Sequence, residues 1–257
     1  MRASKPAILQ LLLLVFVAIA PARAEWTVVA AEPQNTGRAG VVHLKTTVED
    51  ENGTRATLQL AVFSTKSATL RVIDDPEEQR ADLATTMRRE KAIAGVNGGY
   101  FSPEHAAVGL LISDGRRIAP QSKARLLSGV VSVANGKVQV QRAADFSAKA
   151  KVTAARQCGP FLVERSKAVA GLNNTRAARR SFVAVGAGER ALLGFSSHVT
   201  LAQVARILAT PGVAGDFKIE RALNLDGGSS SGFWFEQGPF SISEQKPVRD
   251  HIAVVPK

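Results

Sequence analysis

The residue best placed for chemistry in this 257-residue chain is Asp226, which follows a short apolar stretch and opens the run Asp-Gly-Gly-Ser-Ser-Ser. Gly227 and Gly228 have no side chains that could cover the carboxylate, and glycines let a ligand approach the backbone closely. Ser229 and Ser230 add hydroxyl and N–H groups, which suit anions and sugar hydroxyls. We therefore predict a reactive carboxylate surrounded by a binding loop.

A second motif has the same layout. Another short apolar stretch ends in Asn97-Gly98-Gly99-Tyr100. If both apolar stretches are strands of one sheet, Asn97 and the reactive carboxylate converge at one edge of it. We expect the Asn97 amide to orient a substrate, with Gly98, Gly99 and Tyr100 contributing to its binding.

The N-terminal residues 1–24 read as a secretory signal peptide. Arg2 and Lys5 precede the apolar stretch 7–20, and a small-x-small pattern stands directly before Glu25. The apolar stretch is too short to cross a bilayer, and no later stretch approaches the ~20 apolar residues that a transmembrane helix needs. The sequence predicts an exported protein, periplasmic or extracellular, without a transmembrane segment.

Composition narrows the class of protein further. The formal net charge is +11, and Cys158 is the only cysteine, so a disulfide-rich scaffold is excluded. An exported basic protein is not expected to meet nucleic acid, whereas anionic envelope polymers and phosphate-bearing glycans are suitable partners. No linker or repeat interrupts residues 25–257, which we expect to form one domain.

Several β-strands are predicted. Alternating and apolar stretches at residues 41–48, 57–63 and 68–73 suggest a meander. Hairpin turns are expected at Asp-Gly, Asn-Gly and Gly-Ala-Gly sequences, which occupy residues 114–115, 135–136 and 186–188.

Two helices are predicted between the strands. Asp75 and Pro76 fit the start of a helix that ends near Glu90, and Thr200 with Gln203 fits a capping box. Strands outnumber helices and do not alternate regularly with them. The expected class is α+β, a single domain with a mostly antiparallel or mixed sheet and few helices.

Six motifs in a fixed order carry a family resemblance. They are Asn97-Gly-Gly-Tyr-Phe101, Gly109-Leu-Leu-Ile-Ser-Asp-Gly115, Gln157-Cys-Gly-Pro-Phe-Leu162, Arg180-Ser181, Asn224-Leu-Asp-Gly-Gly-Ser-Ser230 and Lys246-Pro-Val248. Over residues 92–256 the chain resembles the phosphodiester glycosidase family, whose bacterial exported relatives are often linked by name to exopolysaccharide. The resemblance implies hydrolysis of a glycosyl phosphodiester, with an envelope or extracellular glycan as substrate.

The resemblance also implies roles for individual residues. Asp226 would be the nucleophile or base, Arg180 the phosphate clamp and Asn97 an orienting residue, with Lys246 in substrate binding. The family arginine can also be aligned with Arg179. Lys246 stands where the family often has arginine, and a lysine offers a point charge rather than a bidentate fork.

A second carboxylate is not identified by the sequence. Ordinary glycoside hydrolysis uses two carboxylates, but a phosphate leaves more easily than an alcohol, so one carboxylate with cationic help could suffice. The remaining candidates are Glu104, Asp114, Glu164 and Glu236.

Two rival functions remain open. Gly228 to Gly232 match G-x-S-x-G, which would make Ser230 the nucleophile of a serine hydrolase and His251 its base. That motif requires a helix directly after the serine. The other rival is a glycan-binding or envelope domain without catalysis.

No cofactor is predicted. The four histidines are scattered and Cys158 has no ligand-like spacing, so no zinc site is expected. Asn224 and Asp226 could contribute oxygen ligands to a hard divalent cation, and this possibility stays open. We interpret Cys158 as a packing residue.

The signal-peptide hypothesis gives a direct prediction. The N-terminus of the exported protein, measured by mass spectrometry, should be Glu25, because the cleavage pattern ends at Ala24. An intact Met1 on a cytosolic pool would contradict it.

Overall fold

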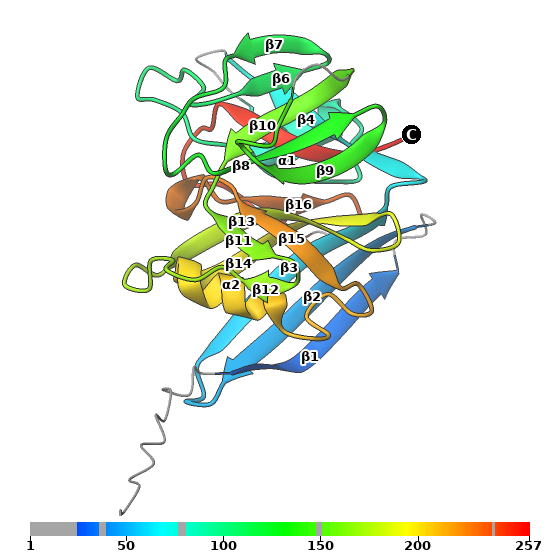
Figure 1. Ribbon diagram of the computed structural model, residues 1–257. Helices are drawn as coiled ribbons and strands as arrows, with labels where there is room; N and C mark the ends of the chain where they lie inside the picture. Colours follow the sequence, from blue (N-terminus) through cyan, green and yellow to red (C-terminus); the bar gives the residue numbers. More distant parts are fainter. Residues whose placement is uncertain (1–24, 36–39, 77–80, 148–150, 238–239) are drawn as a thin grey trace, which may run out of the picture.

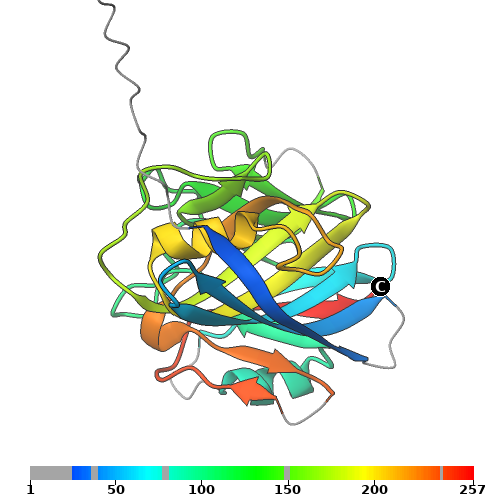
Figure 2. The ribbon, with the colours of Figure 1, turned by 90° about the horizontal axis from the view of Figure 1, so that it is seen from below.

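A computed structural model describes residues 25–35, 40–76, 81–147, 151–237 and 240–257, so the predicted signal peptide lies outside the described residues. Their strands form three sheets in which every pairing is antiparallel (Figures 1 and 2). Two short α-helices accompany them. The antiparallel pairing and the few helices confirm those parts of the prediction, but the protein is mostly β rather than a balanced α+β fold.

The strand orders show how the chain is distributed. The eight-stranded sheet has the order β1 (Trp26–Asn35), β2 (Val41–Asp50), β3 (Arg55–Ser64), β14 (Arg190–Val199), β13 (Ala178–Gly186), β15 (Ile219–Asn224), β11 (Phe161–Glu164) and β12 (Lys167–Ala168). One five-stranded sheet has the order β7 (Arg116–Ala119), β6 (Leu111–Ser113), β10 (Val152–Cys158), β8 (Gly129–Ala134) and β9 (Lys137–Arg142). The other has the order β17 (Ser241–Ile242), β16 (Phe233–Phe235), β5 (Ala94–Asn97), β18 (Asp250–Pro256) and β4 (Ala68–Asp74).

The middle of the eight-stranded sheet is buried on both faces. In β3, Leu58 and Leu60 belong to the apolar cluster under helix α2 (Leu201–Ala209), while Ala61 and Phe63 belong to the core shared with the other two sheets. Because successive side chains of a strand point to opposite faces, the middle of β3 is an apolar run that only Gln59 interrupts. This sheet is therefore the central layer of the molecule (Figure 1).

The hairpin predictions are confirmed. Asp114 and Gly115 connect β6 to β7, and Asn135 and Gly136 connect β8 to β9, all four with positive φ angles of 48° to 78°. The third hairpin joins β13 to β14. Tight turns of this kind need residues that tolerate positive φ, which is why they were visible in the sequence.

The meander prediction is only half right. Strands β2 and β3 pair as expected, but β4 pairs with β18 at the other end of the chain and belongs to a different sheet. Strand β1 was not predicted, and it pairs with β2 at the edge of the eight-stranded sheet. Long-range pairing of this kind leaves no local signal in a single sequence.

The second predicted helix is confirmed and the first is shorter than predicted. Helix α2 starts at the capping box of Thr200 and Gln203. Helix α1 (Leu83–Arg89) is capped by Asp82, whose side chain accepts a hydrogen bond from the backbone N–H of Thr85. The expected cap at Asp75 is therefore wrong, because Asp82, seven residues further along the chain, caps the helix with the same carboxylate chemistry. None of the helices in the described part of the chain is long and apolar enough to span a membrane.

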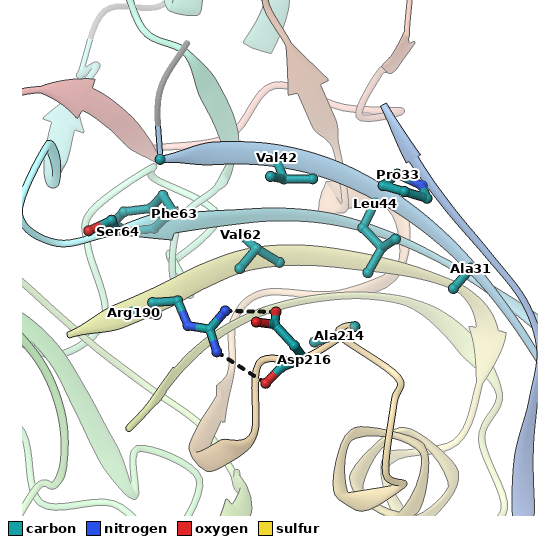
Figure 3. A pocket seen from close by; sticks show the side chains of 12 residues that line it. Ala31, Pro33, Val42, Leu44, Val62, Phe63, Ser64, Arg190, Ala214 and Asp216 are labelled. Atoms are coloured by element: carbon teal, nitrogen blue, oxygen red, sulfur yellow. Dashed lines mark hydrogen bonds and ion pairs between the residues drawn. The ribbon is translucent and has the colours of Figure 1, made fainter. Parts of the chain in front are cut away.

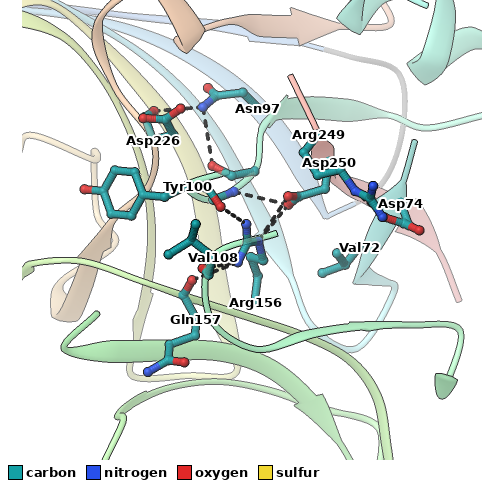
Figure 4. A network of polar contacts seen from close by, with 12 residues as sticks. Val72, Asp74, Asn97, Tyr100, Val108, Arg156, Gln157, Asp226, Arg249 and Asp250 are labelled. Atoms are coloured by element: carbon teal, nitrogen blue, oxygen red, sulfur yellow. Dashed lines mark hydrogen bonds and ion pairs between the residues drawn. The ribbon is translucent and has the colours of Figure 1, made fainter. Parts of the chain in front are cut away.

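A buried ion pair joins the two five-stranded sheets next to the loop that follows β5. Arg156 of β10 and Asp250 of β18 are both 0% exposed, and the guanidinium Nε lies 3.0 Å from Asp250 Oδ1 (Figure 4). Arg156 also donates to the carbonyl oxygens of Tyr100 at 2.6 Å and Val108 at 3.0 Å. Asp250 Oδ1 accepts the backbone N–H of Gly99 at 3.2 Å. The pair thus fixes the loop that follows β5.

This ion pair yields a stability prediction. Asp250→Asn leaves the Arg156 charge buried without its carboxylate, which should lower the free energy of unfolding by about 3–5 kcal/mol in urea denaturation. Asp216→Asn is the matched control, since Asp216 pairs with Arg190 at 2.7 Å but its side chain is 89% exposed. An exposed pair contributes about 0–1 kcal/mol. Equal losses in the two variants would contradict the assigned importance of the buried pair.

Candidate active site

A cavity of about 400 Å³ lies where the loops after β5 and β15 meet. Its lining residues include eight that the sequence singled out: Tyr100, Arg180, Asn224, Asp226, Gly227, Gly228, Ser229 and Lys246. Further lining residues are Asn173, Arg176, Ala178 and Leu201. The two motifs do converge, but not at one edge of one sheet, because β5 and β15 belong to different sheets.

Asp226 is held in place through its backbone. Its N–H donates to the carbonyl oxygen of Gly98 at 3.1 Å, and its carbonyl oxygen accepts from Asn97 Nδ2 at 2.8 Å. The carboxylate accepts the N–H of Gly227 at 2.9 Å. Burial raises the pKa of Asp226 above its usual range, while the positive charge of Lys246 acts in the opposite direction. The result is a fixed and partly desolvated carboxylate at the cavity.

Arg180 brings a buried positive charge to the same cavity. It lies on β13 and is 9% exposed. Its Nε donates to the carbonyl oxygen of Val199 at 3.1 Å and its Nη2 to that of Arg176 at 2.7 Å. No acidic side chain pairs with it among the described residues, and burial lowers its pKa. A desolvated guanidinium without a carboxylate partner is suited to binding an anion.

The geometry distinguishes the two neighbouring arginines. The guanidinium of Arg179 donates to the carbonyl oxygens of Ser231 and Ser243, and it stands 5.3 Å from the ring centroid of Phe195. It therefore ties the loop before β16 to the sheet. Arg180, which lines the cavity, is the arginine that fits the predicted anion-binding role.

Asn97 supports the site from the interior of the protein. It is 1% exposed. Its Oδ1 accepts the hydroxyl of Ser181 at 2.5 Å and the N–H of Gly232 at 3.2 Å, and its Nδ2 binds the backbone of Asp226. Every polar atom of its side chain is used within the protein (Figure 4). The arrangement therefore gives Asn97 a positioning role instead of the predicted contact with substrate.

Three glycines of the two motifs also differ in role. Gly98 and Gly99 are buried, and a Cβ on Gly98 would lie 1.8 Å from Asp250 Oδ1, while one on Gly99 would lie 2.5 Å from Arg156 Cζ. These two glycines make room for the ion pair. Gly228 has a φ of 66° with open space around it, so it serves the turn of the cavity loop.

Tyr100 and Asn224 form one wall of the cavity. The Tyr100 hydroxyl donates to the carbonyl oxygen of Gly159 at 2.6 Å, and burial raises its pKa far above its usual range. Asn224 Nδ2 donates to the same carbonyl at 3.0 Å and to that of Leu225 at 2.5 Å. Asn224 Oδ1, however, has no hydrogen-bond partner among the described residues, although the residue is 2% exposed. A buried acceptor without a partner is costly, which marks Asn224 as a substrate-binding candidate that the sequence reading considered only for a cation.

The rim of the cavity is positively charged. Lys246 is exposed, and its Nζ lies 5.2 Å from the ring centroid of Phe101. Arg176 is also exposed and lines the cavity. The sequence reading missed Arg176 because it lies in a polar loop without a motif.

The serine-hydrolase geometry is not present. Ser230 is 0% exposed and ends the short 3₁₀ helix Gly228–Ser230, after which the chain enters strand β16 instead of a helix. Neither ring nitrogen of His251 has a hydrogen-bond partner among the described residues. Burial lowers the pKa of His251 to about 4. Of the two serines predicted to bind substrate, only Ser229 lines the cavity with its neighbours.

The candidate second carboxylates lie in other surroundings. Glu104 and Glu236 are exposed, Asp114 pairs with Arg71 at 2.8 Å, and Glu164 pairs with Arg142. Asp226 is the one carboxylate among the lining residues named above. No group of three or more His, Cys, Asp or Glu side chains suited to a metal ion occurs in the described ranges.

Cys158 has no role at the cavity. It is 0% exposed, and burial raises the pKa of its thiol to about 12. A thiol that is neutral and inaccessible is a packing residue, as the sequence suggested.

A second cavity, of about 480 Å³, lies on the eight-stranded sheet away from Asp226. It is lined mainly by apolar side chains of β2 and β3, such as Val42, Leu44 and Val62, and its edge carries the Arg190–Asp216 pair (Figure 3). It offers one paired arginine and no group arranged for catalysis. The chemistry is concentrated at the cavity around Asp226.

Comparison with known families identifies the chain. The sequence profile of the phosphodiester glycosidases matches residues 90–255, which include both loops of the cavity. The chain belongs to this family. The matched span coincides with the residues on which the sequence resemblance rested, so the resemblance is confirmed. No curated protein matches the chain in sequence.

Solved structures share the fold at low identity. The catalytic domain of zebrafish N-acetylglucosamine-1-phosphodiester alpha-N-acetylglucosaminidase, auto-inhibited by its pro-peptide, is 14% identical, with a TM-score of 0.64 and coverage of 90% of this chain and 88% of the zebrafish chain. A hypothetical protein from Synechocystis is 16% identical, with a TM-score of 0.62 and coverage of 89% and 64%. A putative exported protein from Burkholderia pseudomallei is 13% identical, with a TM-score of 0.57 and coverage of 79% and 75%.

Proposed function

We propose that this protein is an exported hydrolase that cleaves the bond between the anomeric carbon of a sugar and a phosphodiester, on envelope or extracellular glycans. The observation that carries the proposal is one cavity that holds the half-buried carboxylate of Asp226 and the buried guanidinium of Arg180, neither of which has an ion-pair partner among the described residues. One negative and one positive group without partners suit a substrate with an electrophilic carbon and an anionic leaving group.

The proposed reaction needs one carboxylate. Asp226 attacks the anomeric carbon or removes a proton from the attacking water, and the bond from that carbon to the phosphate oxygen breaks. Where Asp226 is the nucleophile, water then hydrolyses the glycosyl ester and restores the carboxylate. The phosphate leaves with the bonding electron pair and needs no proton from the protein, since its second pKa is about 6. Arg180 stabilises the charge that develops on the departing phosphate.

Other groups of the cavity suit the sugar. Asn224 Oδ1 is a free acceptor for a sugar hydroxyl, and the N–H groups of the Gly228–Ser229 turn can donate to oxygens. Tyr100 contributes a ring as the wall and keeps its proton, because burial raises its pKa. Lys246 at the rim attracts the anionic substrate as a point charge.

Export rests on the predicted signal peptide and on the likeness to a putative exported protein in fold. A basic exported protein fits anionic glycans of the envelope as substrates. The zebrafish enzyme, by its name, acts on an N-acetylglucosamine 1-phosphodiester, which makes that sugar the first one to test.

Asp226→Asn tests the carboxylate. Turnover of a methyl phosphodiester of N-acetylglucosamine, measured as release of free sugar, should fall by at least ~10²-fold, the lower end of typical acid–base contributions. The folded protein binds a proton at Asp226 more readily than the unfolded chain does, so ionisation at pH 7 costs folding free energy. The variant should therefore be at least as stable to urea as the wild type at pH 7.

Two results would oppose this assignment. Unchanged turnover in a folded Asp226→Asn variant would remove Asp226 from the mechanism. A wild-type protein that binds the substrate but never hydrolyses any sugar phosphodiester would favour the non-catalytic glycan-binding alternative.

Arg180→Ala tests the phosphate clamp. Because hydrogen bonds to charged groups contribute about 1.5–3 kcal/mol, kcat/KM on the methyl phosphodiester should fall at least about tenfold. The loss on an uncharged aryl glycoside of the same sugar should be smaller. Arg180→Lys should restore only part of the activity, since lysine lacks the guanidinium fork. Arg116→Ala, an exposed residue of β7, is the control. Equal losses on charged and uncharged substrates would mean that Arg180 only supports the fold.

A further inference from the structure

The cavity around Asp226 carries more positive charge than one phosphodiester can balance. Arg176, Arg180 and Lys246 line it, and the carboxylate facing them is Asp226. None of the three cations forms an ion pair with an acidic side chain within the described ranges, whereas the arginines at positions 71, 142, 190 and 249 all do. Three cations left unpaired at one cavity indicate an anionic ligand.

Arg176 and Arg180 are also close enough to repel each other. The Nη2 of Arg180 donates to the carbonyl oxygen of Arg176 at 2.7 Å. Besides burial, the charge of Arg176 lowers the pKa of Arg180. Two like charges held together without an acid between them cost free energy unless an anion joins them.

The cations lie at two depths. Arg180 is 9% exposed, and its Nη1 lies 3.5 Å from the position of a Cβ on Gly227, which places it beside the loop of Asp226. Arg176 and Lys246 are exposed at the mouth. A phosphate bonded to the sugar would meet Arg180 first, and a group further from the sugar would meet Arg176.

We infer that the preferred substrate is a sugar linked to a diphosphate ester, with the inner phosphate at Arg180 and the outer phosphate at Arg176. A diphosphate diester carries two negative charges at neutral pH and a monophosphate diester carries one. With Asp226 ionised, two charges on the substrate balance the three cations of the cavity. This inference rests on the proposed function, because it names the substrate class of the same site.

The reaction stays a hydrolysis. Water supplies the oxygen that bonds to the anomeric carbon, and the bond from that carbon to the inner phosphate oxygen breaks. The diphosphate monoester leaves with the electron pair, and the proton of the water passes to Asp226 or to solvent. The outer phosphate takes no part in bond breaking, so its contact with Arg176 acts on substrate choice.

The test uses two substrates that differ by one phosphate. They are N-acetylglucosamine 1-(methyl phosphate) and N-acetylglucosamine 1-(methyl diphosphate), and the measured quantity is the ratio of their kcat/KM values. The wild type should prefer the diphosphate, and Arg176→Gln should lower this preference by about tenfold, the lower end for a charged hydrogen bond at an exposed position. Arg116→Gln, the exposed control on β7, should leave the ratio as in the wild type.

Arg176→Gln keeps the backbone carbonyl that holds Arg180, so the fold and the inner phosphate site should survive. Circular dichroism checks the fold. Calorimetric binding of inorganic phosphate and pyrophosphate gives a second readout without turnover. Pyrophosphate should bind the wild type more tightly than phosphate does, and Arg176→Gln should remove most of that difference.

The outcomes separate the inference from the proposed function. If the wild type cleaves both substrates and Arg176→Gln leaves their ratio unchanged, the diphosphate inference is wrong and the proposed function stands. If the wild type cleaves neither, the proposed function fails. In that case, tighter pyrophosphate binding that depends on Arg176 still supports a two-anion site, and equal binding of the two anions overturns it.

Discussion

The buried ion pair of Arg156 and Asp250 is the contact on which the candidate site depends. It joins β10 to β18, and its two side chains fill the space that Gly98 and Gly99 leave free. The loop after β5 is thereby fixed, and Asn97 at its start holds the backbone of Asp226. A sequence of short contacts therefore runs from a fully buried ion pair to the backbone of Asp226, the residue proposed to be reactive. A buried ion pair contributes little net stability compared with apolar packing, so its value here lies in fixing one geometry.

The buried polar groups of the candidate site lower the stability of the folded protein. Asp226 and Arg180 are both largely buried, and burial shifts the pKa of each toward its neutral form. The orphan acceptor of Asn224 adds a further cost. Such groups persist because the rigid surroundings hold them, and a substrate that pairs with them recovers the cost in binding. The free energy that the fold gives up at this cavity is thus available to bind and orient the substrate.

The sequence predicted the parts of this protein that carry local signals. Asp-Gly and Asn-Gly turns and the Thr200 capping box have short-range causes, and the structure confirms them. The loop of Asp226 was found because its glycines and serines interrupt apolar sequence. Arg176 carries no such signal, and neither does the pairing of β4 with the distant strand β18.

Asn97 shows a different limit of sequence reasoning. Its motif, an amide followed by two glycines, looked like a ligand-binding loop. The structure assigns the same residues to the support of Asp226 and to the space for Arg156. A motif indicates that a position needs a certain type of residue. Contact with a buried partner and contact with a bound substrate can both create that need. Only the three-dimensional contacts separate the two causes.

The arrangement of charges explains how a single carboxylate can be enough. In ordinary glycoside hydrolysis a second carboxyl group protonates the leaving alcohol. In the proposed reaction the leaving group is a phosphate, and Arg180 and Lys246 line the same cavity as Asp226. Tyr100 cannot replace that acid readily, since burial raises its pKa and its proton is donated to the carbonyl oxygen of Gly159. Fixed cations stabilise the departing charge without moving a proton, so the leaving-group side of the reaction should depend little on pH. The acid limit of the pH–activity profile should then follow the pKa of Asp226. Because burial raises that pKa, activity should be lost at a higher pH than with an ordinary aspartate.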